Sequence, residues 1–447
     1  MTDKLELAKT FVMNRNLLSG WAKLVTSNAA AGALTLVGIA IAARALDVEE
    51  FGIIVILQAY VRVIDGLFNF QSVNVLTRFL AEAEHGEETA RFRGLVKAGI
   101  LVDGLTAVVA TLVAVLILPL IGTYLGIPSE WTSVAMLYSL VILTRIFGVS
   151  EAVLRCFNLF WTIGLRGTLS ALLVVLCSLG AWWVEAGAAT FLAIWLLAEA
   201  IANIAFLIWT FIALRRQGVN DIWGAKAWEA INQSNGFWGM LWQTNVTFGI
   251  RILSQDADVV VAGAVLGPTA ASLLRAAKSV AGLVSQLGRP LQQVVSAPVS
   301  RLSAQGEFSR MLRYSARTSV LAGMAGLLLT LLMAFFADWV LQLFFGRSYV
   351  GADTITVILV LARTIYLTGV TMMPTMLAIN MGKEFLYSVV VGTAAFFFVM
   401  AVAIGPLGLL GIVIAHVAFE AVWSATGWLW TYRRVSDLNA KQLSTAT

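Results

Sequence analysis

Charged residues are scarce in this chain of 447 residues: 12% of it is charged and 59% is hydrophobic. Soluble domains carry about 25% charged residues, so this composition could not cover the surface of a water-soluble globule. The same scarcity excludes a disordered chain and a nucleic-acid-binding domain. The sequence therefore predicts an integral membrane protein.

Cysteine and histidine are also rare, with two of each. Cys156 and Cys177 are not spaced as metal ligands and lie in apolar runs, which argues against a metal centre and a disulfide-stapled module. The chain has no G-x-x-x-x-G-K-[ST] motif, and no loop is long enough for a nucleotide-binding domain. The predicted outside loops are also too short for the catalytic groups of a membrane glycosyltransferase or polymerase. We therefore expect a transporter without a cofactor, and not an enzyme.

Apolar runs long enough to cross a bilayer as helices, about 20 residues each, are abundant. The first of them is too long for a cleavable signal peptide and is interpreted as a retained helix. The run at 237–265 is the least typical, because it carries charged residues. Twelve runs are predicted, at 21–43, 51–78, 95–118, 131–154, 164–184, 190–213, 237–265, 271–297, 316–337, 353–377, 386–404 and 409–432.

Lysine and arginine are distributed unevenly between alternate loops, which predicts the orientation. With the N-terminus inside, 21 of the 30 basic residues lie in inside segments, and only Arg44 and Arg347 lie in outside loops. The remaining seven lie within spans. The net charge of +5 is therefore mostly a consequence of topology, and both termini are expected to be cytoplasmic.

The two halves of the sequence resemble one another. Leu46 corresponds to Leu266 and Arg78 to Arg301, at offsets of 220 and 223 residues. The repeat predicts an N-terminal six-helix bundle at 1–213, a cytoplasmic inter-bundle linker at 214–236, and a C-terminal six-helix bundle with a cytoplasmic tail at 237–447. Since six spans is an even number, both halves should run in the same sense.

Polar side chains form a stripe along one face of the second span and of the eighth, at about 100° per residue. Charge within the membrane is costly and usually faces a bundle interior or a water-filled cavity. The two stripes are therefore expected to form opposite walls of one hydrophilic cavity. They comprise Gln58, Arg62, Asp65, Asn69 and Ser72 on the second span, and Arg275, Lys278, Gly282, Gln286, Arg289 and Gln293 on the eighth.

Simpler interpretations of some charges remain open. Arg62 and Asp65, three residues apart, could merely neutralise one another. Arg145 and Glu151 are expected near a helix end, where their polar groups would snorkel to the membrane surface.

The seventh span adds Arg251 and Asp258 on one face, while Asp256 points elsewhere. A buried acid such as Asp258 could carry a proton, because desolvation favours its protonated form. It could equally be a permanent partner of Arg275 or Lys278 on the next span. We favour the pairing role over ion coupling.

Five short stretches stand in order at predicted helix ends. They are R-A-L-D-V-E-E-F-G (Arg44–Gly52), L-F-N-F-Q-S-V-N-V-L-T-R-F (Leu67–Phe79), L-F-F-G-R-S-Y-V-G-A-D (Leu343–Asp353), Asn380–Lys383, and G-P-L-G-L-L-G (Gly405–Gly411). Together they resemble the polysaccharide (O-antigen and exopolysaccharide) flippases, in the superfamily shared with multidrug and toxin extrusion transporters and the lipid II flippase. The resemblance runs from about Asn16 to Arg434, and departs from the family at Ala271 and Leu273, where Gly and an aromatic residue are usual.

The resemblance implies an all-α polytopic protein of the bacterial cytoplasmic (inner) membrane. Its two pseudo-symmetric six-helix bundles would surround a central cavity and open alternately to the inside and the outside. The implied substrate is a polyprenyl pyrophosphate that carries an oligosaccharide for lipopolysaccharide or exopolysaccharide synthesis. Implied partners are this lipid-linked oligosaccharide, membrane lipids, and polysaccharide polymerase and export proteins.

The cavity residues fit such a substrate, because cations bind pyrophosphate through charge-assisted hydrogen bonds and amides bind a glycan. The predicted phosphate ligands are Arg62, Arg251, Arg275, Lys278 and Arg289. The predicted glycan ligands are Gln58, Asn69, Gln286 and Gln293. The residues predicted for ion coupling or for ion pairs in the cavity are Asp65, Asp256 and Asp258. One alternative is an ion-coupled multidrug efflux transporter of the same fold, whose cavity should be lined by acids. Another is a non-catalytic scaffold of a polysaccharide-export complex, which would need no cations at mid-membrane depth.

Overall fold

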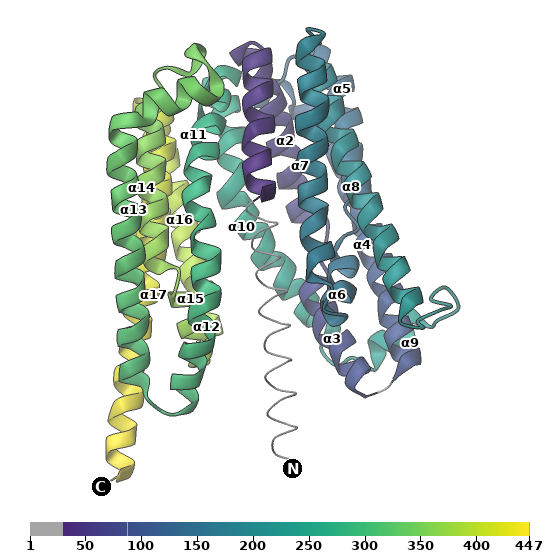
Figure 1. Ribbon diagram of the computed structural model, residues 1–447, viewed down its shortest axis with the longest axis vertical. Helices are drawn as coiled ribbons and strands as arrows, with labels where there is room; N and C mark the ends of the chain where they lie inside the picture. Colours follow the sequence, from purple (N-terminus) through teal and green to yellow (C-terminus); the bar gives the residue numbers. More distant parts are fainter. Residues whose placement is uncertain (1–29, 87, 447) are drawn as a thin grey trace. The chain divides into compact units, whose positions relative to one another are not determined.

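The computed structural model describes residues 30–86 and 88–446 (Figure 1). These residues form helices joined by short turns, with no β-strand among them. Each of the twelve predicted spans coincides with helix, although residues 21–29 of the first span lie outside the described residues. The prediction of an all-helical polytopic membrane fold is confirmed.

The helices of the first half are 30–45, α2 (Val48–Phe68), α3 (Val73–His85), α4 (Thr89–Ile121), α5 (Thr132–Ser139), α6 (Gly148–Cys156), α7 (Phe160–Trp183) and α8 (Ala188–Arg216). The short helix α9 (Ala227–Asn232) follows. The second half contains α10 (Phe237–Leu266), α11 (Pro268–Gln286), α12 (Gly288–Ala304), α13 (Phe308–Phe345), α14 (Asp353–Gly369), α15 (Met372–Ala378), α16 (Gly382–Leu407) and α17 (Leu409–Ala446).

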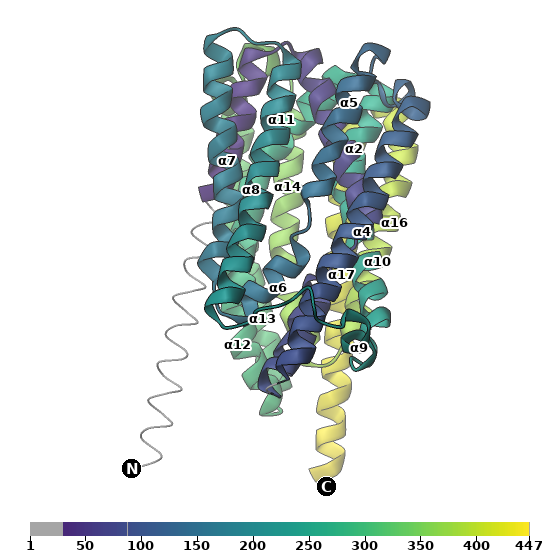
Figure 2. The same ribbon diagram turned by 90° about the vertical axis from the view of Figure 1, so that its right-hand side faces the viewer.

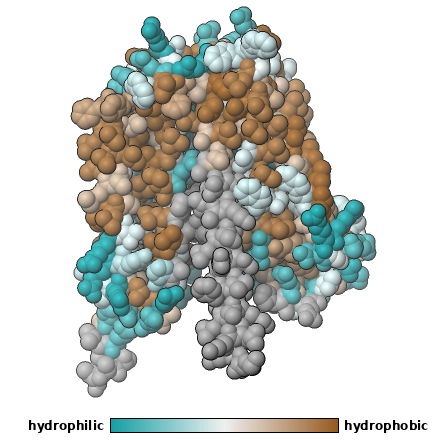
Figure 3. All heavy atoms as spheres, viewed as in Figure 1, coloured by the Kyte–Doolittle hydropathy of each residue, from teal (hydrophilic) through white to brown (hydrophobic). Residues whose placement is uncertain are grey.

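Nine helical segments within the described residues are long and apolar enough to cross a membrane. Three predicted spans are not among these nine. They are the first, which is described only from Ala30, and the seventh and eighth, which carry charged residues. Between hydrophilic ends, apolar side chains cover the surfaces seen in Figure 3, as expected where a helix faces lipid.

The chain divides into two compact units. Unit 1 contains the described residues up to Leu46 and Leu57–Leu253, and unit 2 contains Asp47–Ile56 and Ser254–Thr447. The division therefore falls within α10, outside the predicted linker at 214–236. The beginning of α10 packs in unit 1, where Asn245 Oδ1 accepts a hydrogen bond from the Gln71 N–H at 2.7 Å.

The first turns of α2 pack in unit 2, against the start of α11. Gly52 lies so close to Pro268 that a Cβ added to the glycine would be 2.0 Å from the proline carbonyl oxygen. Any side chain at this position would force α2 and α11 apart. The Phe-Gly pair that ends the first of the five family-like stretches therefore has a packing reason.

Within unit 1, α7 and α8 run side by side, and α9 lies against α4 (Figure 2). A core cluster joins α3, α4, α6 and the start of α10, with Leu76, Leu95, Val153 and Leu241 all buried. Because lipid tails are as apolar as leucine, such a core stabilises membrane helices through van der Waals packing and not through removal of side chains from water. The core therefore connects the helices that carry the polar residues described below.

Within unit 2, α13, α14, α16 and α17 pack together (Figure 1). The stretch Gly405–Gly411 forms the expected tight turn, since α16 ends at Leu407 and α17 begins at Leu409. The core of this unit includes Met311, Met372 and Met376. Methionine fills irregular gaps well because its side chain is unbranched and flexible.

The second and fourth spans of each half are interrupted. In the first half the helix breaks at 69–72 and 145–147, and in the second half at 287 and 370–371. The apolar runs continue through these positions, so the hydropathy pattern did not predict the breaks. Backbone groups freed at a break inside a membrane must be satisfied by neighbouring side chains.

Candidate functional site

A buried ion network binds the two broken spans of unit 1. Arg145 lies immediately after the short helix that ends at Thr144, and its guanidinium donates to Asp65 Oδ2 at 2.8 Å. It also binds Glu199 of α8 through two hydrogen bonds, of 2.7 and 3.1 Å. The Arg145 side chain is only 10% exposed. A guanidinium can satisfy both carboxylates because it presents five donors in a rigid plane.

The expectation that Arg145 snorkels from a helix end is therefore wrong. The helix does end there, but the neighbouring acids come from α2 and α8, 80 and 54 residues away in sequence. Three charges buried together are better compensated than an isolated cation. Glu151, given the same interpretation, pairs instead with Arg155 one turn later.

Asn69 extends the network across the break in the second span. Its Nδ2 donates to Asp65 Oδ1 at 2.9 Å, and its Oδ1 accepts from the Thr106 hydroxyl at 3.2 Å. The Thr106 hydroxyl oxygen also accepts the Phe70 N–H at 3.1 Å. Side chains of α4 thus replace the helical hydrogen bonds that the break removes.

Asp103, also on α4, serves the break in the fourth span. Its Oδ2 accepts the Val149 N–H at 2.9 Å, at the start of α6. A carboxylate is favoured there because the first N–H groups of a helix have no helical partner. A Cβ at Gly148 would lie 2.7 Å from Asp103 Oδ2 and 3.0 Å from Ser72 Oγ, so only glycine allows this close approach.

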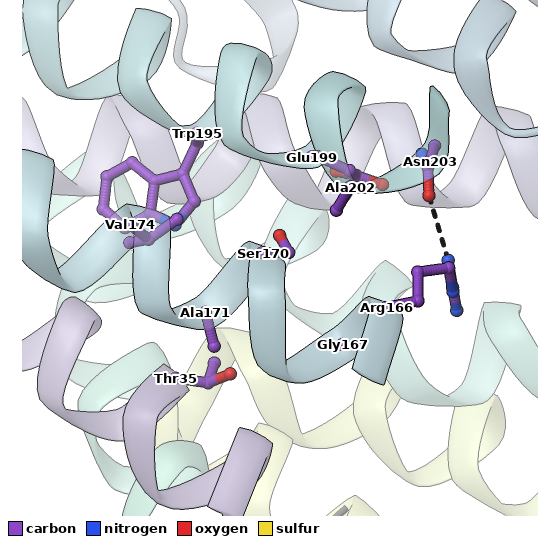
Figure 4. A pocket seen from close by; sticks show the side chains of 10 residues that line it. All are labelled: Thr35, Arg166, Gly167, Ser170, Ala171, Val174, Trp195, Glu199, Ala202 and Asn203. Atoms are coloured by element: carbon purple, nitrogen blue, oxygen red, sulfur yellow. Dashed lines mark hydrogen bonds between the residues drawn. The ribbon is translucent and has the colours of Figure 1, made fainter. Parts of the chain in front are cut away.

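A cavity of about 260 Å³ borders the network in unit 1 (Figure 4). Helix 30–45, α7 and α8 line it with Thr35, Arg166, Gly167, Ser170, Ala171, Val174, Trp195, Glu199, Ala202 and Asn203. Figure 4 shows Trp195 at one end and Arg166 with Asn203 at the other, with Ser170 and Glu199 between them. The cavity therefore combines an aromatic surface with several hydrogen-bonding groups.

Arg166 is held in place at the polar end of this cavity. It donates to Asn203 Oδ1 at 3.1 Å, and its guanidinium carbon lies 4.3 Å from the centre of the Phe147 ring. Asn203 in turn donates to the Thr144 hydroxyl at 3.1 Å. Arg166 was among the 21 basic residues predicted for inside segments, at the edge of the span 164–184, and it lies on the second turn of α7. Its spacing before an apolar run resembles that of an ordinary flanking cation, so the sequence contained no signal for its role.

Unit 2 contains a different buried cluster. Asp258 of α10 binds Lys278 of α11, with both carboxylate oxygens 2.7 Å from Nζ. His416 Nε2 of α17 lies 2.7 Å from Asp258 Oδ2. The Asp258 side chain is fully buried, so its charge depends on these partners. Arg275 and Lys278 were the two partners considered for Asp258 from the sequence, and in the structure Asp258 binds Lys278.

A second ion pair in unit 2 joins Arg363 of α14 to Glu420 of α17, at 2.7 Å. Arg363 and Glu420 follow Arg145 and Glu199 by 218 and 221 residues, close to the repeat offset of 220. Both pairs connect the fourth and sixth spans of their half. The repeat seen in short sequence matches is thus accompanied by a matching pair of buried charges and by breaks in corresponding spans.

The break at 370–371 in unit 2 is held by hydroxyl groups. At 370–371 the Thr371 hydroxyl lies 2.7 Å from the Ser319 hydroxyl and donates to the Ser315 carbonyl at 3.1 Å. Ser315 and Thr375 are joined in the same way, at 2.8 Å. These contacts connect α13 to both sides of the interrupted span without using charge.

The predicted phosphate ligands have different environments. Lys278 is neutralised by Asp258, so its charge is less available to a substrate. Arg62 and Arg275 are partly buried on α2 and α11, and Arg251 is exposed on α10. Arg289 is on α12, but its side chain lies outside the described part of the structure.

The predicted glycan ligands also differ from one another. Gln58 is 6% exposed, and its Nε2 has no hydrogen-bond partner among the described residues. Asn69 is occupied by the network of unit 1. Gln286 is partly buried at the end of α11, and the side chain of Gln293 lies outside the described part.

The acids proposed for coupling or ion pairing are similarly placed. Asp65 and Asp258 are both buried in ion pairs, and Asp256 is partly buried on α10. No group of three or more histidine, cysteine, aspartate or glutamate side chains that could hold a metal ion occurs in the described residues.

No family model matches the chain. It is 24% identical to the inner membrane protein YghQ of Escherichia coli strain K12 over 347 residues, which cover 76% of this chain and 95% of YghQ. In structure it is similar to the lipid II flippase MurJ in an inward closed conformation, with a TM-score of 0.72 and 13% identity, over 94% of this chain and 90% of MurJ.

It is also similar to an inward-facing multidrug resistance MATE family transporter of the MOP superfamily, with a TM-score of 0.68 and 14% identity, over 93% of this chain and 95% of the transporter. A eukaryotic MATE transporter, AtDTX14, gives a TM-score of 0.64 at 13% identity, over 95% and 99% of the two chains. The chain therefore has the fold of MOP-superfamily transporters. These structural neighbours are transporters or flippases, not enzymes.

Proposed function

We propose that this protein is an alternating-access flippase that moves a polyprenyl-pyrophosphate-linked oligosaccharide from the inner to the outer leaflet of the bacterial inner membrane. The product would enter cell-surface polysaccharide synthesis, with a polysaccharide polymerase and export proteins as partners. The similarity to a lipid II flippase supports the substrate class, and the name of the Escherichia coli relative supports the membrane. The two sequence halves would act as the two moving bundles, with both termini cytoplasmic.

The observation that carries the proposal is the pairing of four acids of the membrane-spanning helices with cations of the protein, while a fifth, Asp103, accepts the Val149 N–H. Asp65, Glu199, Asp258 and Glu420 each bind an arginine or a lysine. An acid that is already paired with a cation of the protein offers little attraction to a cationic drug. The arginines of the predicted cavity suit a pyrophosphate instead, since one guanidinium can donate two parallel hydrogen bonds to phosphate oxygens.

The proposed phosphate ligands are Arg62, Arg251, Arg275 and Arg289, with Lys278 in a lesser role because of its pair with Asp258. Gln58 is the strongest of the proposed glycan ligands. Its amide nitrogen is buried without a partner in the described structure, and a sugar hydroxyl would supply one. Asn69, Gln286 and Gln293 complete the proposed polar lining.

The test uses purified protein in vesicles with a fluorescent polyprenyl pyrophosphate that carries one N-acetylglucosamine. Wild-type protein should move the lipid between leaflets, as measured by the accessibility of the fluorophore to a membrane-impermeant quencher. Arg275→Ala should lower the rate by about 10- to 100-fold, because a hydrogen bond to a charged group is lost. Arg310→Ala removes an exposed cation on α13 and is the matched control.

If the single variants Arg62→Ala, Arg275→Ala and Arg289→Ala all move the lipid at the wild-type rate, the anion-binding cavity is contradicted. The MATE likeness favours one competing function, the efflux of cationic compounds. Transport of ethidium by the same vesicles, without movement of the lipid, would establish that function instead.

A further inference from the structure

The cavity of unit 1 has a chemistry distinct from that of the predicted phosphate ligands. Its lining includes one cation, Arg166, and one acid, Glu199, so the charges of the lining side chains balance. Such a site favours neither a pyrophosphate nor a drug cation. It suits a neutral ligand with many hydroxyl groups, because Ser170, Thr35 and Asn203 add further hydrogen-bonding atoms.

The opposite end of the cavity is apolar and flat. Trp195 presents its ring there, beside Val174 (Figure 4). An aromatic ring offers a large apolar surface at low conformational cost, and its edge nitrogen can still donate a hydrogen bond. A pyranose ring has the complementary structure, with C–H groups on its faces and hydroxyl groups around its edge.

The polar groups are fixed before any ligand arrives. Glu199 is held by two hydrogen bonds from Arg145, and Arg166 is held by Asn203 and by stacking on Phe147. Ligand binding would therefore cost little side-chain entropy. The carboxylate and the guanidinium nevertheless keep further hydrogen-bonding capacity, since each can bind several partners.

Small residues leave the space open. Gly167, Ala171 and Ala202 line the cavity between the aromatic and the polar end. A volume of about 260 Å³ is below the range typical of sites for drug-sized ligands, about 300–1,000 Å³. The space suits one sugar ring and not a whole oligosaccharide.

We propose that the cavity between helix 30–45, α7 and α8 binds a single neutral sugar ring, stacked on Trp195 and hydrogen-bonded by Glu199, Arg166 and Ser170. This inference rests on the proposed function, since the sugar would belong to the lipid-linked oligosaccharide. It adds a sugar-recognition site in unit 1 to the phosphate ligands proposed above, of which Arg62 and Arg251 belong to unit 1 and Arg275 and Arg289 to unit 2. The site therefore selects among glycans on the same lipid carrier.

The experiment compares two ligands, a polyprenyl pyrophosphate without sugar and the same lipid carrying one N-acetylglucosamine. Binding to purified protein in lipid nanodiscs is measured by microscale thermophoresis. The wild-type protein should bind the sugar-bearing lipid about tenfold more tightly. Trp195→Ala should abolish this difference and leave the affinity for the bare lipid unchanged, while Trp195→Phe should retain most of it.

Two further variants separate a sugar site from a structural effect. Gly167→Leu should fill the cavity and also abolish the difference; a Cβ at this position meets only the Ala31 methyl group, at 3.7 Å, which is ordinary van der Waals contact. Trp183→Ala removes a tryptophan that is 90% exposed and lies outside the cavity, and should change nothing.

The outcomes are distinguishable. A wild-type protein that binds both lipids equally, or a sugar-dependent difference that survives in Trp195→Ala and Gly167→Leu, overturns the sugar site. An equal loss of affinity for both lipids in Trp195→Ala also overturns it, because the tryptophan would then contact the lipid itself.

A wild-type protein that binds neither lipid contradicts the proposed function. The pocket is then tested by itself with free methyl N-acetylglucosaminide and saturation-transfer NMR. A signal that Trp195→Ala removes supports the sugar site, and no signal overturns it.

Discussion

The two units interrupt corresponding spans but hold the interruptions together with different chemistry. In unit 1, carboxylates and a guanidinium bind the breaks, through Asp65, Asp103 and Arg145. In unit 2, the break at 370–371 is bound by the hydroxyls of Thr371 and Ser319. One unit thus uses strong, charge-dependent contacts where the other uses weak, neutral ones.

The charges of unit 2 lie away from that break. Lys278 joins α10 to α11 through Asp258, while Arg363 joins α14 to α17 through Glu420. Because each pair connects two helices, unit 2 is held by separate pairs and unit 1 by one shared cation. The difference indicates that single substitutions should affect unit 1 more than unit 2.

The largest effect is expected for Arg145→Leu. This substitution leaves the buried Asp65 and the partly exposed Glu199 without Arg145, and removing one partner of a buried ion pair typically costs about 3–5 kcal/mol. The midpoint of thermal unfolding in detergent should fall well below that of the wild type. Arg310→Ala, which removes an exposed pair on α13, is the control. An unchanged midpoint would show that the network of unit 1 is not a stabilising element.

A smaller effect is expected for Lys278→Met, because only one carboxylate loses its partner. His416 remains 2.7 Å from Asp258 and can take up a proton to replace the lost charge. The destabilisation should therefore diminish as the pH falls into the range in which histidine takes up a proton. Unfolding midpoints of Lys278→Met measured at several pH values test this, and a difference from the wild type that stays constant as the pH falls would contradict it.

The smallest effect is expected for Thr371→Val at the neutral break of unit 2. Hydrogen bonds between helices within membranes contribute about 0.6 kcal/mol on average. The variant should unfold close to the wild type, but the amides near 370–371 should exchange faster in hydrogen-exchange mass spectrometry. A loss of stability as large as that of Arg145→Leu would remove the distinction between the units.

The sequence predicted the helices because apolar length alone determines a membrane span. It also indicated the repeat, and the Asp258–Lys278 pair was one of two partners considered. It did not predict the pairing of Arg145 with Glu199, because residues 54 apart on different helices can be matched only when the packing is known. The sequence did contain one signal for this pair, since Arg145 and Glu199 recur in the second half as Arg363 and Glu420, 218 and 221 residues later.

The cavity of unit 1 was beyond sequence reasoning for a different reason. Trp195 and Ser170 are ordinary residues of apolar helices, and only the packing of α7 on α8 brings them together. Arg166 was predicted to be an inside-segment cation at the start of the span 164–184, since a cation before an apolar run usually marks a membrane boundary. The sequence pattern alone cannot distinguish a cation that marks a membrane boundary from one that also lines a cavity.

The ion pairs of unit 2 have an electrical consequence. A single charge that crosses a membrane potential of 100 mV changes in energy by about 2.3 kcal/mol. Lys278 with Asp258, and Arg363 with Glu420, each sum to zero and move with the helices that carry them. The resting voltage would therefore exert little net force on these two pairs, and any voltage dependence of transport would come from the other charges of the helices and from the cargo.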